Sequence, residues 1–483
     1  MNIAEILSNS EPHHYGDSIV SIDSENREIF VISDLHMAAG INSNGNYDGT
    51  ENFFADKSLS RFLGYLRKTK RFDKKGLLII NGDFIDFLRI RNRPVTPKDF
   101  EDWSEILKSL GIAKNADTLR ASITNKELIY GLRTDDFKSV YKLSICYQGH
   151  PAVFRCLTSW LEEGNDLLIV KGNHDLEWYW KLVRDYLRLL LAKNISTSAQ
   201  QIRFVDDKLI IDKKLYIEHG HHYENFTNVD GDPLMPGGKE LNLPFGSFFN
   251  RYLINRIELA YPFIDDVRPR ENILPVLIRE RFPLAIRLLF RYIPFLLLVI
   301  PKKQYRFALR FFLQFVWIIV IPILITVVAV YLSIPHPTHL IPAKFSSSGS
   351  SSIWTTILSP LKNLLFLSLS YFMGRLFSIL ELSAPTSFYP NAQAVFKIYP
   401  EIELVTFGHT HDPEQKKSNG KSYYNTGTWI PVFELDAADV RLDKTYTFLQ
   451  ISRDPANGIH TEGLMRWNDD AGRSEEMQLR DSI

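Results

Sequence analysis

Five short apolar runs, each ending in polar side chains, constrain the fold of this chain more than any other feature of its sequence. They are rich in Ile, Val and Leu and read REIFVISDLH, GLLIINGDFID, DLLIVKGNHD, KLYIEHGHH and IELVTFGHTH. Such runs are typical of buried β-strands that lead into loops. Stretches with helical spacing, such as SLSRFLGYLRKTKRF and FRCLTSWLEEG, separate the first three. The alternation predicts an α/β core.

Each predicted strand ends in side chains that can bind a metal ion. Strand ends in an α/β sheet converge on one edge, so ligands far apart in the sequence can meet there. Residues two apart in a strand point the same way, so a D-x-H or H-T-H sequence can supply a pair of ligands. The candidates are Asp34, His36, Asp83, Asn173, His219, His409 and His411.

These seven residues suit two divalent ions. Asp34, His36, Asp83 and His411 would hold the first ion, and Asp83, Asn173, His219 and His409 the second, with Asp83 bridging. Oxygen and imidazole ligands without thiolate suit manganese, iron or zinc, which the sequence does not rank. Any one of these side chains alone could be a cap or a surface group. His219 is chosen because a strand ends there, and the histidines that follow it could contact solvent or substrate.

The ordered set D-x-H, GDxxD, GNHD, HG and GHTH resembles the calcineurin-like metallophosphoesterase superfamily over about residues 28–222 and 400–467. The resemblance implies a four-layer sandwich of two mixed β-sheets flanked by helices, and a dinuclear centre that activates a hydroxide nucleophile. It also implies that His174 stabilises the transition state or protonates the leaving oxygen. Asp175 would then orient the His174 imidazole, or would cap the helix that follows.

Two further residues are candidates for substrate binding. Asn425 lies in YNTGTW, which resembles a polar loop of the same superfamily. Arg89 follows the second motif, together with Arg91 and Arg93, and a guanidinium offers paired donors to phosphate or carboxylate oxygens. Solvated surface charges are the alternative reading of these arginines.

The ligand motifs divide the chain into a split core with two insertions. Lys and Arg number 56, as do Asp and Glu, so the charge balance does not indicate nucleic acid as a partner. Two cysteines without metal-ligand spacing indicate neither a disulfide framework nor a zinc ribbon. The predicted parts are 1–224 with a helical insertion at 88–161, a membrane-associated insertion at 225–400, 401–470, and a tail at 471–483.

The second insertion contains apolar runs that predict transmembrane helices. Residues 311–334 carry no charged side chain and would extend about 36 Å as a helix, against about 30 Å of hydrocarbon. Residues 353–380 form a second candidate, and 294–301 are too short to span. His219 precedes these runs while His409 and His411 follow them, so the number of crossings should be even or zero. Basic residues between 268 and 310 favour a catalytic domain on the cytoplasmic side of the membrane.

The sequence therefore predicts a metal-dependent hydrolase of phosphate or pyrophosphate esters, including lipid-linked ones, at the cytoplasmic membrane surface. Two alternatives remain open. A nuclease of the same superfamily would carry similar ligands, although no basic groove with interleaved aromatic residues is evident. A non-catalytic membrane scaffold would have kept the fold and lost its chemistry, whereas this chain retains every ligand.

Overall fold

The computed structural model divides the chain into two compact units, Met1–Arg268 with Pro385–Ile483, and Pro269–Ala384. The first unit holds almost all the described residues. The described residues are 19–22, 27–70, 74–192, 200–224, 226–229, 231–260, 267–268, 281, 283–284, 387–434, 439–440, 444–454, 458–477 and 479.

A seven-stranded mixed sheet carries the first three ligand motifs. Its order is β16-β15-β14-β2-β3-β4-β5, with β2 to β5 parallel and β14 to β16 antiparallel. The four parallel strands are consecutive apolar runs, so their carboxyl ends share one edge. The strands are β2 (Glu28–Ile32), β3 (Gly76–Asn81), β4 (Asp166–Val170), β5 (Ile202–Val205), β14 (Thr447–Asp454), β15 (Gly458–Asn468) and β16 (Arg473–Glu476).

A six-stranded mixed sheet carries the other two motifs, in the order β1-β6-β7-β9-β11-β10. Here β7, β9 and β11 are parallel neighbours, and β9 joins the two halves of the first unit because it pairs with β7. Its strands are β1 (Ile19–Ile22), β6 (Lys208–Ile211), β7 (Leu215–Glu218), β9 (Leu404–Phe407), β10 (Glu414–Ser418) and β11 (Lys421–Asn425), and a small third sheet contains β8 (Val267–Arg268), β12 (Phe433–Glu434) and β13 (Asp439–Val440).

The two large sheets pack face to face through aliphatic side chains. Along β2, Ile29 and Val31 point into this interface, where Leu209 and Ile217 of the six-stranded sheet meet them. Phe30 and Ile32 point to the opposite face, because successive side chains of a strand alternate. A strand buried on both faces is apolar throughout, which explains the continuous apolar runs of the sequence.

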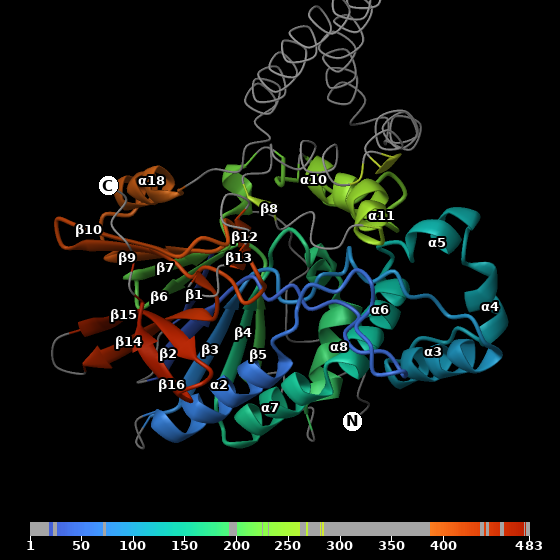
Figure 1. The fold of residues 1–483 in the computed structure, drawn as a ribbon, viewed down its shortest axis with the longest axis horizontal. Coiled ribbons are helices and arrows are strands. Elements are labelled where there is room, and N and C mark those ends of the chain that lie inside the picture. The colour runs from blue at the N-terminus through green and yellow to red at the C-terminus, as the bar shows by residue number, and fades with distance from the viewer. Residues whose placement is uncertain are drawn as a thin grey trace, which may run out of the picture. The chain divides into compact units, whose positions relative to one another are not determined.

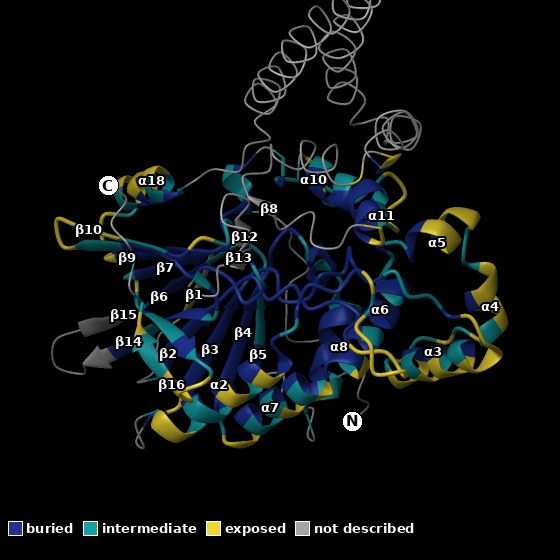
Figure 2. Ribbon diagram, in the orientation of Figure 1, coloured by how far each residue is buried: buried dark blue, intermediate teal, exposed yellow. Residues whose placement is uncertain are grey.

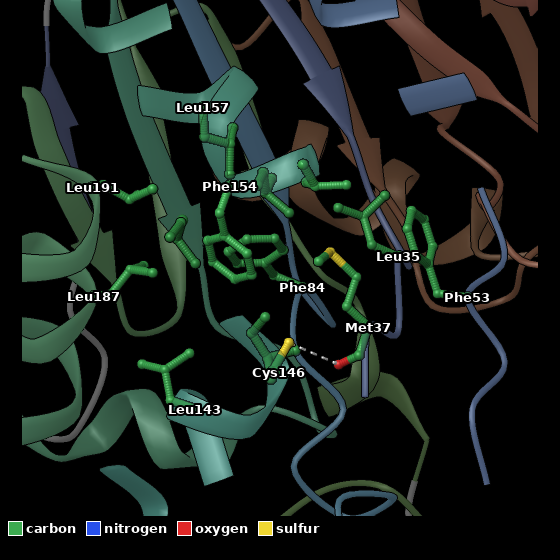
Figure 3. Close-up of a cluster of buried hydrophobic side chains, with 14 of the residues drawn as sticks. Leu35, Met37, Phe53, Phe84, Leu143, Cys146, Phe154, Leu157, Leu187 and Leu191 are labelled. Carbon is green, nitrogen blue, oxygen red and sulfur yellow. Dashed lines mark hydrogen bonds between the residues drawn. The ribbon is translucent and has the colours of Figure 1, made fainter. Parts of the chain in front are cut away.

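Helices cover the outer face of each large sheet (Figures 1 and 2). The core against the seven-stranded sheet is shown in Figure 3, where Phe84 and Phe154 lie beside Met37 and Cys146. It is formed by α2 (Asp56–Thr69), α6 (Asp136–Gly149), α7 (Pro151–Glu162) and α8 (Lys181–Leu191), while α18 (Tyr389–Ile398) packs on the six-stranded sheet. Cys146 is buried and Cys156 is partly buried, and both are free thiols.

Residues 88–161 are largely helical. Capping boxes start two of the helices: Thr96 with Asp99, and Thr124 with Glu127, each pair satisfying backbone N–H groups of the first turn. The helices before α6 are α3 (Pro97–Ser109), α4 (Ala116–Ala121) and α5 (Asn125–Tyr130). A short helical stretch from later in the chain packs nearby: α10 (Phe245–Phe249), the π-helix η3 (Asn250–Ile254) and α11 (Asn255–Glu258). Arg251 of η3 donates to the backbone oxygens of Gly131 and Leu132.

The predicted fold class, a sandwich with a helical transmembrane insertion, is wrong as stated. Within the described residues, no helix combines the length and the apolar character that a bilayer crossing requires. The longest of these helices, α2 and α6, have 14 residues, or about 21 Å against about 30 Å of hydrocarbon. Residues 294–301, 311–334 and 353–380 lie outside the described part of the chain. The fold is corrected to mixed α/β with two mixed sheets.

A buried ion network between α6 and α7 should make the stability of the fold depend on pH. His150 is fully buried, with Nδ1 2.8 Å from Asp56 Oδ1 and Nε2 3.2 Å from Glu51 Oε2. Burial alone would lower the pKa of His150, but the hydrogen bonds to Asp56 and Glu51 raise it to about 9. Because the folded-state pKa lies above the unfolded value of 6.5, the protonated imidazole stabilises the fold by about 3 kcal/mol below pH 6.5.

We therefore expect His150→Gln to lower the free energy of unfolding most strongly below pH 6.5. The difference from the unsubstituted protein should shrink as the pH rises through about 9. Urea unfolding of both proteins across this range measures it. A difference that stays constant with pH would mean that the charge of His150 contributes nothing.

Candidate metal centre

The carboxyl ends of five strands bring the predicted ligands to one place. β2, β3 and β4 end just before Asp34, Asp83 and Asn173, and β7 and β9 of the other sheet end just before His219 and His409. Side chains from the two sheets interleave there: Asp34 and His36 group with His411, and Asp83 groups with His219 and His409, with all ligand atoms of a group within 4.8 Å of one another.

The backbone at these strand ends is unusual. Nine non-glycine residues of the described chain have positive φ, and five of them are predicted ligands. L-residues avoid this left-handed region, and such conformations gather where function over-determines the backbone. They turn the chain sharply after each strand, so that the side chains face the centre. The five are Asp34, His36, Asp83, His409 and His411, with φ of 54, 48, 50, 69 and 61°.

The first group converges on one carboxylate oxygen. Asp34 Oδ1 lies 3.8 Å from His36 Nε2 and 3.4 Å from His411 Nε2, and these two nitrogens are 3.1 Å apart. Asp34 Oδ2 accepts a hydrogen bond from the backbone N–H of His409, whereas the buried Oδ1 has no hydrogen-bond partner among the described residues. An oxygen and two imidazole nitrogens therefore face one point, which is the donor set of a divalent cation site.

The second group shares Asp83 with the first. Asp83 Oδ2 lies 3.2 Å from His219 Nε2 and 3.6 Å from His36 Nε2, while Oδ1 accepts from the backbone N–H of His174. A single oxygen thus lies between the two groups, as a bridging ligand requires. Asn173 Oδ1 and His219 Nε2 are buried without a hydrogen-bond partner in the part of the chain that the structure describes. These orphaned acceptors fit a second cation.

In three of the candidate ligand histidines, the ring nitrogen that does not face the centre lies against a hydrogen-bond acceptor. His219 Nδ1 donates to the backbone oxygen of Asn81 at 2.8 Å, and His36 Nδ1 lies 3.2 Å from Asp86 Oδ2. His409 Nε2 lies 2.8 Å from Glu224 Oε2. A histidine that ligates a metal normally donates its second N–H in this way, which leaves a lone pair on the first nitrogen. Glu224 is a residue that the sequence reading missed, because no periodicity or motif marks it.

Two glycines make room for this packing. A Cβ on Gly82, which has φ of +83°, would lie 2.2 Å from His219 Nδ1, and a Cβ on Gly172 would lie 2.1 Å from Asp83 Oδ1. Either contact is too close for a side chain to fit without displacing a ligand. Glycine therefore recurs beside the ligands for a steric reason.

Buried negative charge is concentrated at this point. Burial alone would raise the pKa of Asp34, Asp83 and Asp86, but the neighbouring imidazoles, His219 at Asp34 and Asp83 and His174 at Asp86, lower all three below their ordinary values. The carboxylates therefore remain charged although they are shielded from water. Buried carboxylates combined with histidine nitrogens are an arrangement that divalent cations stabilise.

His174 forms a further group of possible metal ligands with His36 and Asp83, and it contacts a different aspartate from the one expected. Its Nδ1 is 2.7 Å from Asp86 Oδ2, and its ring is 4.7 Å from that of His36. Burial alone would lower the pKa of His174, but the charges of Asp86 and Asp83 raise it above its ordinary value. Asp86 therefore orients this imidazole. Asp86 is the second aspartate of the NGDFID motif, of which the sequence reading used only Asp83.

Asp175 instead holds the loop between β4 and η1 (Leu176–Tyr179). It accepts hydrogen bonds from the backbone N–H groups of Gly172 and Phe84, at 2.6 and 2.9 Å, and from Trp178 Nε1 at 2.8 Å. Burial raises the pKa of Asp175 to about 7. The role expected for Asp175, orienting His174, is corrected, because its oxygens are occupied by these three donors.

Arg89 and Asn425, the predicted substrate-binding residues, are both buried and brace the centre. Arg89 lies 3.3 Å from Asp86 Oδ2 through Nε and pairs with Glu258 through Nη1. Asn425 Nδ2 donates to the backbone oxygen of Gly408 at 2.8 Å and to Thr410 Oγ1 at 3.1 Å. Each residue is only 1% exposed. Their positions correct the expectation of direct substrate contact and indicate support for Asp86 and for the loop that carries His409 and His411.

Of the two histidines after His219, His221 lies beside the second group, with its ring 5.4 Å from that of His219 and 6.4 Å from that of His409. His221 is fully buried, and burial lowers its pKa well below the ordinary value. His222 Nε2 lies 2.8 Å from Asp207 Oδ1, and the nearby Glu218 accepts hydrogen bonds from the hydroxyls of Tyr216 and Tyr223.

Comparison with protein-family models and with curated protein sequences finds no match for this chain.

Proposed function

We propose that this protein is a phosphoesterase that hydrolyses phosphate or pyrophosphate esters with two divalent metal ions. One observation carries the proposal: Asp83 Oδ2 lies between two clusters of carboxylate and imidazole ligands drawn from four strand ends. Two ions held in this way lower the pKa of water and neutralise phosphoryl oxygens. The motif set resembles the calcineurin-like metallophosphoesterases, and that likeness supports the same reaction.

Metal binding and proton transfer are assigned to different residues in this proposal. Asp34, His36 and His411 would hold one ion, and Asn173, His219 and His409 the other, with Asp83 shared. His174 is the proton donor in this scheme, because Asp86 holds its Nδ1 and leaves Nε2 to exchange a proton with the leaving oxygen. A raised His174 pKa suits a group that must carry a proton near neutral pH.

Hydrolysis of bis(p-nitrophenyl) phosphate by the purified full chain tests the proposal. We expect no activity after a chelator has removed bound metal, activity after manganese is added back, and about two ions per chain in the active protein. Iron and zinc serve as parallel additions. Activity that persists in the metal-free protein would refute the proposal, and so would a purified chain that binds no ion.

A further inference from the structure

A cavity of about 340 Å³ lies at residues 91–93, which follow the turn that contains Asp86 and Arg89. This volume is in the range of small-molecule sites. Its walls come from three segments: the loop at Asp48 and Gly49, the stretch from Leu128 to Gly131 at the end of α5, and Leu259 after α11. It is separate from the metal ligands, none of which lines it.

Two guanidinium groups line this cavity. Arg91 and Arg93 both line the cavity, together with Asn92 between them. Arg91 Nη2 donates to the backbone oxygen of Ile129 at 3.1 Å, which fixes its direction and leaves its other donors for a ligand. In the described part of the chain, neither arginine forms an ion pair with a carboxylate.

The local charge is positive. Asp48, the acidic residue in the lining, is turned toward Thr50, from whose backbone N–H and hydroxyl its Oδ1 accepts hydrogen bonds at 3.3 and 3.1 Å. Burial and then the nearby Arg256 lower the pKa of Arg91, and the charge of Asp48 offsets this only in part. An anion that neutralises these guanidinium groups would relieve their repulsion.

Part of the lining is aliphatic. Seven large hydrophobic side chains are exposed among the described residues, and three of them line this cavity: Leu128, Ile129 and Leu259, at 48, 47 and 53% exposure. Such a cluster is more than the scattered exposure of a normal surface. The described lining has no aromatic ring on which a nucleobase could stack.

We propose that this cavity binds an aliphatic phosphate ester, a site beyond the metal centre and its reaction. Arg91 and Arg93 hold the phosphate, since paired guanidinium groups match its oxygens. The aliphatic wall packs against the first methylene groups of the ester. The cavity therefore recognises a phosphate and its alkyl chain together.

Calorimetric titration of the metal-free full chain with inorganic phosphate and with ethyl, butyl and hexyl phosphate tests this site. A chelator keeps the metal centre empty of ions, so the result does not depend on hydrolysis or on the proposed function. We expect affinity to increase along the series by about fourfold for each methylene that is buried. Affinity that is the same for all four ligands, or no binding of hexyl phosphate, would overturn the proposal.

Variants assign the binding to the two walls. Arg91→Gln with Arg93→Gln should weaken hexyl phosphate at least about tenfold, because charge-assisted hydrogen bonds are lost. Arg155→Gln, which removes an exposed arginine of α7, is the matched control and should change nothing. Leu128→Ser should flatten the dependence on chain length and leave inorganic phosphate unchanged. Equal effects of the Arg91, Arg93 and Arg155 changes would place the anion elsewhere and refute the site.

Discussion

Replacing Asp83 by asparagine should reduce the bound metal from about two ions per chain to one or none and lower phosphoesterase activity at least about a thousandfold. Asp83 Oδ2 is the oxygen that both ligand groups share, 3.6 Å from His36 Nε2 and 3.2 Å from His219 Nε2. An amide keeps the shape of the side chain but removes the charge that a bridging ligand supplies. Metal analysis and the rate of bis(p-nitrophenyl) phosphate hydrolysis, measured on the same preparation, give both quantities.

Asp412→Asn is the matched control for this change. Asp412 follows His411 directly, but its side chain is half exposed and pairs with Lys444 at 2.8 Å. Removing its charge should therefore leave the metal content and the rate as they were. If Asp83→Asn kept two ions and full activity, the assignment of Asp83 as the shared ligand would be wrong.

Replacing His174 by glutamine should lower kcat by about 10²- to 10⁴-fold while the metal content stays at about two ions per chain. In the proposed scheme Asp86 holds His174 Nδ1 at 2.7 Å, Nε2 carries the proton that the leaving oxygen takes, and the other seven side chains hold the ions. The loss should be larger for a phenyl ester than for a p-nitrophenyl ester, because the p-nitrophenolate departs without a proton. Parallel kinetics on the two esters measure this difference.

The Asp86→Asn variant, measured in the same experiment, separates the orientation of His174 from the binding of metal by His36. It removes the carboxylate that faces Nδ1 of both His174 and His36, at 2.7 and 3.2 Å. We expect it to reproduce the leaving-group dependence of His174→Gln, with an added weakening of metal binding through His36. Equal losses on both esters after His174→Gln, together with lost metal, would show instead that His174 is a ligand.

The strand ends were predictable because β-structure and ligand chemistry coincide in the same few residues. Apolar runs identified β2, β3, β4, β7 and β9, and the parallel alignment of neighbouring strands brings the residues after them together. The choice of His219 over the two histidines that follow it depended only on where the strand ends, and its ring does face Asp83.

Other roles depended on three-dimensional contacts that no local pattern encodes. Asp175 follows His174 in the sequence, yet it turns to the Gly172 and Phe84 backbone, and Asp86 from another strand end takes its expected place. Arg89 is of a residue type that often binds phosphate groups. It is buried here, and it pairs with Glu258, which comes 169 residues later in the sequence. Such long-range partners determine whether a charged side chain supports the structure or binds a ligand.

The pairing of β7 with β9 has a consequence for how the protein matures on the ribosome. Leu215–Ile217 align with Leu404–Thr406, so an inner strand of the six-stranded sheet emerges long after its neighbour. Until then β7 presents a bare edge, and His409 and His411 have not been made. The metal centre is therefore incomplete until the segment between β7 and β9 has been synthesised. Contacts between residues so distant in sequence form late and slowly.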